Sequence, residues 1–157
     1  MKLFIDALIA FIISMLPVFE LRGGLPYAAI RGVPVALAFA ICFAGNILPV
    51  PFTLLFIRRI FAYLKRFKRI GAIVTKLENR AIAKSDTVRK YQLVGLFLFV
   101  AIPLPGTGAW TGSLIAATLN LPIRKSFPVI ALGILCAGII MVVLSYLIPG
   151  LFFNLTQ

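Results

Sequence analysis

The chain has 157 residues, 62% of them hydrophobic, and its mean hydropathy is +1.09. Soluble domains carry about 45–50% apolar residues, so this composition excludes an ordinary soluble domain and predicts a single integral membrane domain over the whole chain. The net charge is +12 and histidine is absent, which excludes zinc ligation, general-base catalysis and proton relay by histidine.

The first predicted element is an apolar arm, Leu3 to Leu16, that is too short to cross a bilayer. As a helix it extends about 21 Å, whereas the hydrocarbon core is about 30 Å thick. A segment rich in Pro, Gly and charge, Pro17 to Pro26, follows it, and Leu25 to Ile30 forms a shorter second arm. We expect a re-entrant hairpin that enters and leaves on one side. The alternative is one tilted helix kinked at Pro17.

The next run, Val35 to Ile57, carries no charge and is long enough to span the membrane. Asn46, Pro49 and Pro51 interrupt it, which predicts a kink or a break in its second half. The basic pair that begins at Arg58 is expected to end this helix.

A basic segment separates two similar halves of the chain. Within residues 60–90, apolar side chains recur every three or four positions opposite lysine and arginine, which predicts an amphipathic helix lying in the membrane interface. Because basic clusters favour the cytoplasmic side and anionic lipid, we expect residues 58–90 to be cytoplasmic and to contact anionic phospholipid. No base-stacking or groove-reading module accompanies the charge, so nucleic acid is not an expected partner.

The second half, residues 91–157, keeps the order of residues 1–59: a short arm, a Pro/Gly-rich tip, a returning arm and a long span. The loop before each long span also matches, since Gly32–Pro34 corresponds to Asn120–Pro122. The segments of the second half are Leu93–Ile102, Pro103–Gly112, Ser113–Leu121 and Phe127–Ile148.

Each half therefore contains one hairpin and one span, an odd number of crossings, so consecutive halves take opposite orientations. The predicted fold is an all-α integral membrane protein: an inverted repeat of a re-entrant hairpin plus a transmembrane helix, with the basic cytoplasmic helix between the halves. Arg124 and Lys125 then fall on the cytoplasmic side, and Lys2 and Arg31 outside, as the positive-inside rule expects. The small size of the chain favours a homodimer.

One acidic residue, Glu20, is predicted to lie within the membrane. A carboxylate there is costly unless it is paired or protonated, which makes it a candidate for carrying a coupling proton or for holding a cationic group. Arg22, two residues away, is a candidate for binding an anion. The alternative is a structural ion pair between the two that fixes the hairpin tip.

The two tips supply the remaining candidates for substrate binding. Glycines let a backbone come close to a ligand, helix N-termini offer free N–H groups to phosphate or carboxylate, and threonines add hydroxyl donors. Packing of small residues between helices is the alternative role of the glycines, and anchoring of the hairpin is that of Trp110. The predicted binding residues are Glu20, Arg22, Gly23, Gly24, Pro105, Gly106, Thr107, Gly108, Trp110 and Thr111.

The motifs Glu20–Pro26 and Pro103–Gly112 resemble those of the small multidrug export family of prokaryotic membrane proteins. The predicted pair of re-entrant hairpins is also similar to the DedA / VTT-domain group, which includes flippases for polyprenyl-phosphate carriers and lipid scramblases. These resemblances imply transport across a prokaryotic plasma membrane. They also imply that Glu20 and Arg22 match the membrane-embedded acidic and basic residues of the DedA group.

We therefore expect a secondary transporter or flippase that works by alternating access around the paired tips. The first candidate substrate is an anionic lipid phosphate of polyprenyl type, held by Arg22 and the tip N–H groups, with Glu20 taking the coupling proton. The second is a small cationic or amphipathic compound that uses Glu20 as its counter-charge. A third interpretation is a structural membrane protein that transports nothing. The sequence holds no nucleotide-binding loop, metal-ligand cluster or nucleophile–base pair, so we expect no enzyme activity, cofactor or metal.

Overall fold

The computed structural model describes residues 1–64, 86–104 and 106–148, and its regular elements are helical. No strand occurs within these ranges, so the predicted all-α class is confirmed. The elements are α1 (Lys2–Met15), α2 (Glu20–Ile30), α3 (Val35–Ile47), α4 (Pro49–Leu64), α6 (Asp86–Ala101), α7 (Ala109–Thr118), α8 (Ile123–Val142) and the π-helical η1 (Val143–Leu147).

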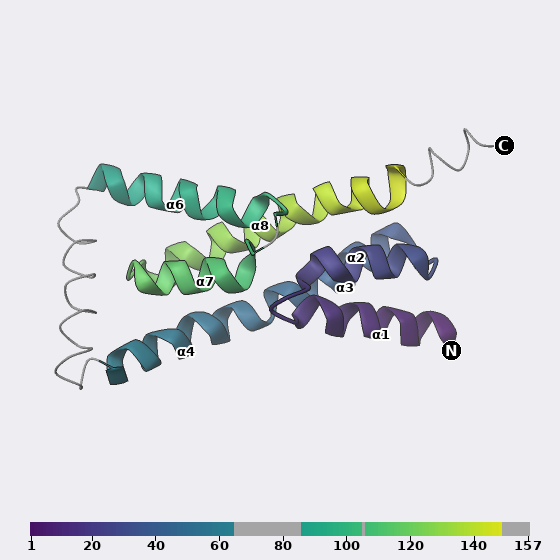
Figure 1. Ribbon diagram of the computed structural model, residues 1–157, viewed down its shortest axis with the longest axis horizontal. Coiled ribbons are helices and arrows are strands. Elements are labelled where there is room, and N and C mark those ends of the chain that lie inside the picture. The colour runs from purple at the N-terminus through teal and green to yellow at the C-terminus, as the bar shows by residue number, and fades with distance from the viewer. Residues whose placement is uncertain (65–85, 105, 149–157) are drawn as a thin grey trace.

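The helices form two groups that meet near the middle of the molecule (Figure 1). At one end α1, α2 and α3 pack together, and at the other α7 packs against α4 and α6. Helix α8 runs from one group into the other and contacts α6, α2 and α3. The turn between α1 and α2, residues 16–19, and the described residues between α6 and α7, 102–104 and 106–108, both lie at this central junction.

Two helical stretches are long and apolar enough to cross a membrane: Val35–Ile57 and Ile123–Leu147. The first is broken at Leu48, between α3 and α4, as the prolines predicted. The prediction that the basic pair at Arg58 ends this helix is wrong, because α4 continues to Leu64. The amphipathic helix expected over residues 60–90 falls largely on residues 65–85, which lie outside the described residues.

The arms are longer and the tips shorter than the sequence predicted. Helix α2 already begins at Glu20, α6 begins at Asp86 instead of Leu93, and α7 begins at Ala109. Helices α1 and α2 lie side by side and antiparallel, so the chain reverses after Met15 and does not continue as one helix kinked at Pro17. Most of the first predicted tip, from Glu20 onwards, is therefore helical, whereas in the second predicted tip only the part from Ala109 onwards is helical.

Both returning arms end in the same backbone motif. At the end of α2 the N–H of Val33 bonds to the Ala28 carbonyl (2.9 Å), and Gly32 takes a φ of +71°. At the end of α7 the N–H of Leu121 bonds to the Ala116 carbonyl (2.9 Å), and Asn120 takes a φ of +53°. Gly and Asn are the residues that tolerate this left-handed position of a Schellman cap. The sequence match between these two loops thus corresponds to a shared conformation.

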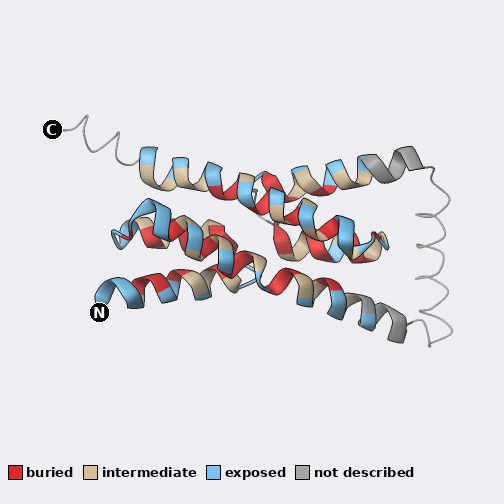
Figure 2. Cartoon of the chain, turned by 180° about the vertical axis from the view of Figure 1, so that it is seen from behind, coloured by how far each residue is buried: buried red, intermediate tan, exposed pale blue. Residues whose placement is uncertain are grey.

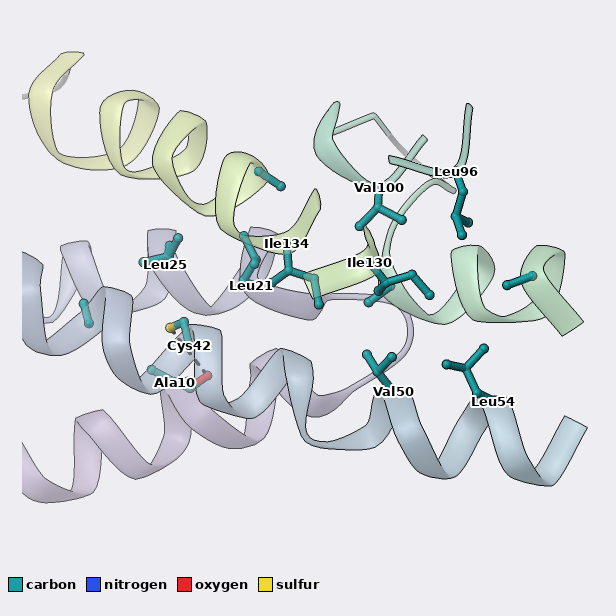
Figure 3. Packing of buried hydrophobic residues seen from close by; sticks show 14 of the residues in the cluster. Ala10, Leu21, Leu25, Cys42, Val50, Leu54, Leu96, Val100, Ile130 and Ile134 are labelled. Carbon is teal, nitrogen blue, oxygen red and sulfur yellow. Dashed lines mark hydrogen bonds between the residues drawn. The ribbon is translucent and has the colours of Figure 1, made fainter. Parts of the chain in front are cut away.

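The core consists of small side chains where the helices cross and of aliphatic side chains around them (Figure 3). In the first group, Ala10 of α1 lies against Cys42 of α3, whose Sγ is 3.9 Å from the Ala10 carbonyl oxygen. In the second group, Val100 of α6 fits against both Gly112 of α7 and Gly133 of α8. Glycine at these crossings lets the helices approach closely, which is the usual way of packing in a membrane.

Many large apolar side chains are exposed, and exposed positions alternate with buried ones along most of the described helices (Figure 2). Large exposed side chains include Phe4, Phe52, Phe56, Leu132 and Ile139. Soluble monomers rarely expose contiguous apolar patches larger than a few hundred Å². Lipid is therefore the environment that fits this surface.

We predict that Gly24→Ala destabilises the protein by about 1–3 kcal/mol, because the core at this position is already filled. A Cβ at Gly24 would overlap Ser14 Oγ and lie 2.8 Å from the Ala10 carbonyl oxygen. The matched control is Gly95→Ala in α6, where nothing lies within 4 Å. Thermal unfolding in detergent should show a lower melting temperature for the first variant alone, and equal melting temperatures would contradict the packing.

Candidate functional site

The two hairpins are joined through the side chain of Glu20, the first residue of α2. Glu20 is 4% exposed, and its carboxylate accepts hydrogen bonds from the backbone N–H groups of Ala109 (3.3 Å) and Trp110 (3.2 Å). These N–H groups begin α7 and have no partner within their own helix. Helix α7 has no side-chain cap of its own, so a carboxylate from the other hairpin caps it.

Backbone conformation at two positions makes this contact possible. Gly108, just before α7, has a φ of +136°, and a Cβ there would collide with the carboxylate of Glu20. Glycine is therefore required both for its conformation and for its lack of a side chain. Glu20 itself takes a φ of +52°, which costs a non-glycine residue about 1–3 kcal/mol and is typically retained at functional sites.

Arg22 makes the complementary contact, two residues further along α2. Its Nη1 donates to the carbonyls of Leu104 and Thr107, the latter at 2.6 Å, and its Nη2 donates to the carbonyl of Ile102 at 3.3 Å. These carbonyls lie at the end of α6 and in the tip, where no further helical turn supplies donors. One hairpin thus offers an anion to the N–H groups that begin α7 and a cation to the carbonyls that follow α6.

Glu20 and Arg22 do not form the ion pair that the sequence left open as an alternative. The described part of the chain holds an ion pair between Arg31 Nε and Asp6 Oδ1, 2.8 Å apart, and none between Glu20 and Arg22. Each of the two residues instead binds the backbone of the opposite hairpin. The charges are therefore satisfied mainly by backbone groups, and both hairpins must be in place for this to happen.

The predicted residues of the second tip mostly stabilise the tip itself. Thr107 Oγ1 donates to the carbonyls of Ile102 and Leu104, both at 2.9 Å. Trp110 Nε1 donates to the Met15 carbonyl at 3.2 Å, which is the predicted anchoring role. Thr111 Oγ1 donates to the Gly108 carbonyl at 3.5 Å, and Thr111 also lines two cavities.

The remaining predicted residues divide between packing and open space. Gly23 and Gly24 pack against α1 and the preceding turn, with Phe19 Cβ 2.9 Å from a Cβ placed at Gly23. Gly106, with a φ of +81°, has nothing within 4 Å of such an atom. Pro105 lies outside the described residues. Gly23 and Gly24 are thus spacers between helices, whereas Gly106 serves the turn.

Asp6 and Asn46 are two of the buried polar residues that are absent from the sequence-based site. Asp6 lies within the arm treated as apolar; its Oδ1 accepts from Arg31 Nε and, at 3.3 Å, from the Tyr27 hydroxyl, which ties α1 to α2. The hydrogen bond with Asp6 raises the pKa of the Arg31 guanidinium. Asn46, 1% exposed at the end of α3, interacts through its side chain with the Glu20 carboxylate. In the sequence, Asp6 and Asn46 each stand out as a polar residue inside an otherwise apolar run, and this was the signal that could have identified them.

Two cavities adjoin this junction. The smaller, of about 550 Å³, lies between the tips and is lined by Glu20, Arg22 and Thr107. The larger, of about 870 Å³, lies between α4 and α7 and is mostly apolar. Pro17 and Thr111 line both cavities, so the two adjoin each other. The larger cavity is lined by Pro17, Phe52, Thr53, Leu55, Phe56, Ile57, Arg59, Trp110, Thr111 and Leu114.

Within the described ranges, no three His, Cys, Asp or Glu side chains gather as metal ligands do.

We predict that Gly108→Ala lowers stability more than Gly106→Ala, although both substitutions introduce a side chain at positive φ. That conformation costs each variant about 1–2 kcal/mol. Gly108→Ala also displaces Glu20 from α7, and hydrogen bonds to a charged group contribute about 1.5–3 kcal/mol. Melting temperatures of the two variants in detergent measure the difference. If Gly108→Ala were no worse than Gly106→Ala, the carboxylate cap would not contribute to stability.

Residues 20–140 match the family described as "putative small multi-drug export protein". Neither a curated protein nor a solved structure matches the chain. The match does not extend to the DedA group, so that similarity stays a prediction. The matched range begins at Glu20, directly after the turn of the first hairpin; it includes the second tip and the Glu20 and Arg22 contacts that join the hairpins, and it covers most of the chain. The chain belongs to the small multidrug export family, and it is a membrane protein of the transporter class.

Proposed function

We propose that the protein is a proton-coupled exporter of small amphipathic cations in a prokaryotic plasma membrane, working by alternating access at the junction of its tips. The observation that carries the proposal is the buried Glu20 carboxylate, which joins the two hairpins beside an apolar cavity. A membrane-embedded carboxylate with no ion-pair partner is a site where a proton and a cation can compete.

The proposed membrane arrangement is an inverted repeat of two re-entrant hairpins. Helices α2 and α7 have 11 and 10 residues, so each extends about 15 Å, half of the hydrocarbon core. The hairpins approach the centre from opposite ends of the molecule (Figure 1), which supports this arrangement. Residues 58–90 then lie in the cytoplasm against anionic phospholipid, and a homodimer is the expected assembly.

Protonation of Glu20 is the proposed switch. The ionised carboxylate holds α7 through charge-assisted hydrogen bonds, which are roughly twice as strong as neutral ones. A neutral Glu20 holds α7 more weakly, and its charge no longer complements the positive end of the α7 dipole. The tips can then separate and open a path past Glu20 from one side of the junction to the other.

The larger cavity is the proposed substrate site. Its volume of about 870 Å³ suits a small organic compound, since ligand pockets span about 300–1,000 Å³. Apolar side chains would bury the body of the compound, and the face of Trp110 attracts a cation. Arg59 lies six residues beyond Thr53, about 9 Å along α4, so the cationic head is expected at the Thr53 end, towards Glu20.

An anionic lipid phosphate, the other candidate from the sequence, is less well supported. The N–H groups that begin α7 already bind Glu20, and the Arg22 guanidinium already binds tip carbonyls. A phosphate would have to displace these partners. An amphipathic cation can enter the larger cavity without displacing these partners. It competes only later, when it takes the place of the proton at Glu20.

We predict that acid-inside proteoliposomes take up ethidium, with the membrane potential clamped by potassium and valinomycin. Glu20→Gln should abolish this uptake, because the amide cannot exchange a proton or balance a cation. The control is Asp6→Asn, which removes the carboxylate that pairs with Arg31 and should retain uptake. Undiminished uptake by Glu20→Gln would contradict the proposal. Flipping of labelled polyprenyl phosphate without ethidium uptake would favour the lipid substrate.

We also predict that Pro34→Cys and Pro122→Cys react with a membrane-impermeant maleimide from opposite sides, in a background without Cys42 and Cys136. The two prolines are matched, because each is the N-cap of a membrane-spanning stretch. In an inverted repeat these equivalent loops must face opposite compartments. Labelling of both from the same side of intact cells would exclude the arrangement.

A further inference from the structure

A second buried polar side chain lies beside Glu20 at the junction. Asn46 is 1% exposed and occupies the last turn of α3, directly before the break at Leu48. It therefore comes from the first membrane-spanning stretch, which places a third element next to the two hairpins. Its side-chain amide interacts with the Glu20 carboxylate.

Half of the Asn46 amide is unused in this arrangement. Its Oδ1 is buried and has no hydrogen-bond partner among the described residues. An ionised carboxylate only accepts hydrogen bonds, so the NH₂ group of the amide is the half that can serve it. A buried acceptor without a donor costs about 1–3 kcal/mol, and such a group in a folded protein calls for an explanation.

Protonation of Glu20 creates the donor that this oxygen lacks. A protonated carboxyl has an O–H, which needs an acceptor once it is buried. The other described groups that interact with the Glu20 carboxylate are the N–H groups of Ala109 and Trp110 and the guanidinium of Arg22, and none of these accepts a hydrogen bond. Among the groups that interact with Glu20, Asn46 brings a buried acceptor, Oδ1, that no described residue uses.

We propose that Asn46 is the positioning residue of the proton site and serves both states of Glu20. Its NH₂ group donates to the ionised carboxylate, and a half-turn about χ2 brings Oδ1 to accept from the protonated carboxyl. The proton comes from water on one side of the membrane and leaves to water on the other, and the amide gains or loses no atom. This inference rests on the proposed proton coupling at Glu20.

The electrostatic surroundings of Glu20 fit such a switch. Arg22 is the charged side chain that acts on Glu20 among the described residues, and α1, α3, α7 and α8 bring no second charge to it. Arg22 is a donor only and already donates to three tip carbonyls, so it cannot accept a hydrogen bond from a protonated Glu20. The amide is therefore the polar neighbour free to reorient.

Infrared difference spectroscopy of the full chain in bilayers tests this assignment without any transport assay. The carbonyl stretch of protonated Glu20 is identified as the band that is present in the acid-minus-neutral difference spectrum of the wild type and absent from that of Glu20→Gln. In Asn46→Leu we expect this band to move to higher wavenumber, because the O–H loses its acceptor. Asn46→Thr keeps an acceptor and should leave the band near its wild-type position. The matched control is Ser126→Ala, which removes a buried hydroxyl that bonds to the Pro122 carbonyl.

A second measurement needs no Asn46 variant and so remains valid if Asn46→Leu does not fold. With ¹³C-labelled asparagine, the wild-type difference spectrum should contain a shifted amide carbonyl band that disappears in Glu20→Gln. An unmoved Glu20 band in Asn46→Leu, or no amide band in the wild type, would overturn the inference. If the wild type showed the amide band and Asn46→Leu shifted the Glu20 band, but the wild type took up no ethidium, the export proposal alone would be contradicted.

Discussion

A helix that breaks in apolar surroundings leaves N–H and C=O groups that cost several kcal/mol each if nothing binds them. The interruption between α6 and α7 is the place where this constraint is strongest. Glu20 binds the N–H groups that begin α7, and Arg22 binds carbonyls released at the end of α6. Both side chains belong to the other hairpin. The interruption between α6 and α7 therefore depends on the position of α2, and the position of α2 depends on the interruption.

This constraint also limits what the site can do. Charged groups that hold the backbone together are not free to hold a permanent ligand, so the phosphate site expected at the helix N-terminus is already filled by a carboxylate of the chain itself. In the same arrangement the contact between Glu20 and α7 depends on the protonation state of Glu20, because an ionised carboxylate forms stronger hydrogen bonds than a neutral one. A structural contact and a transport switch can thus be one and the same group.

The sequence predicted the helical class, the two long stretches and the location of the tips, because proline, glycine and hydrophobic length act locally. Proline at 49 and 51 was enough to predict the break at Leu48. The cross-hairpin caps could not be predicted, since no local rule says that Glu20 binds a backbone 89 residues away. The nearby opposite charge of Arg22 suggested an ion pair instead. A basic pair at the end of an apolar run does not by itself end a helix, because arginine is a good helix former, and α4 continues to Leu64.

The distance between the two tips, measured by electron paramagnetic resonance, tests the central claim most directly. Spin labels at Val18 and Leu104, both exposed and both at the cavity between the tips, report whether the hairpins stay joined. The account predicts one narrow distance distribution at neutral pH, and a broader, longer one at acid pH. Glu20→Gln should give the broad distribution at every pH. An unchanged narrow distribution in Glu20→Gln would contradict the claim that the Glu20 carboxylate joins the tips.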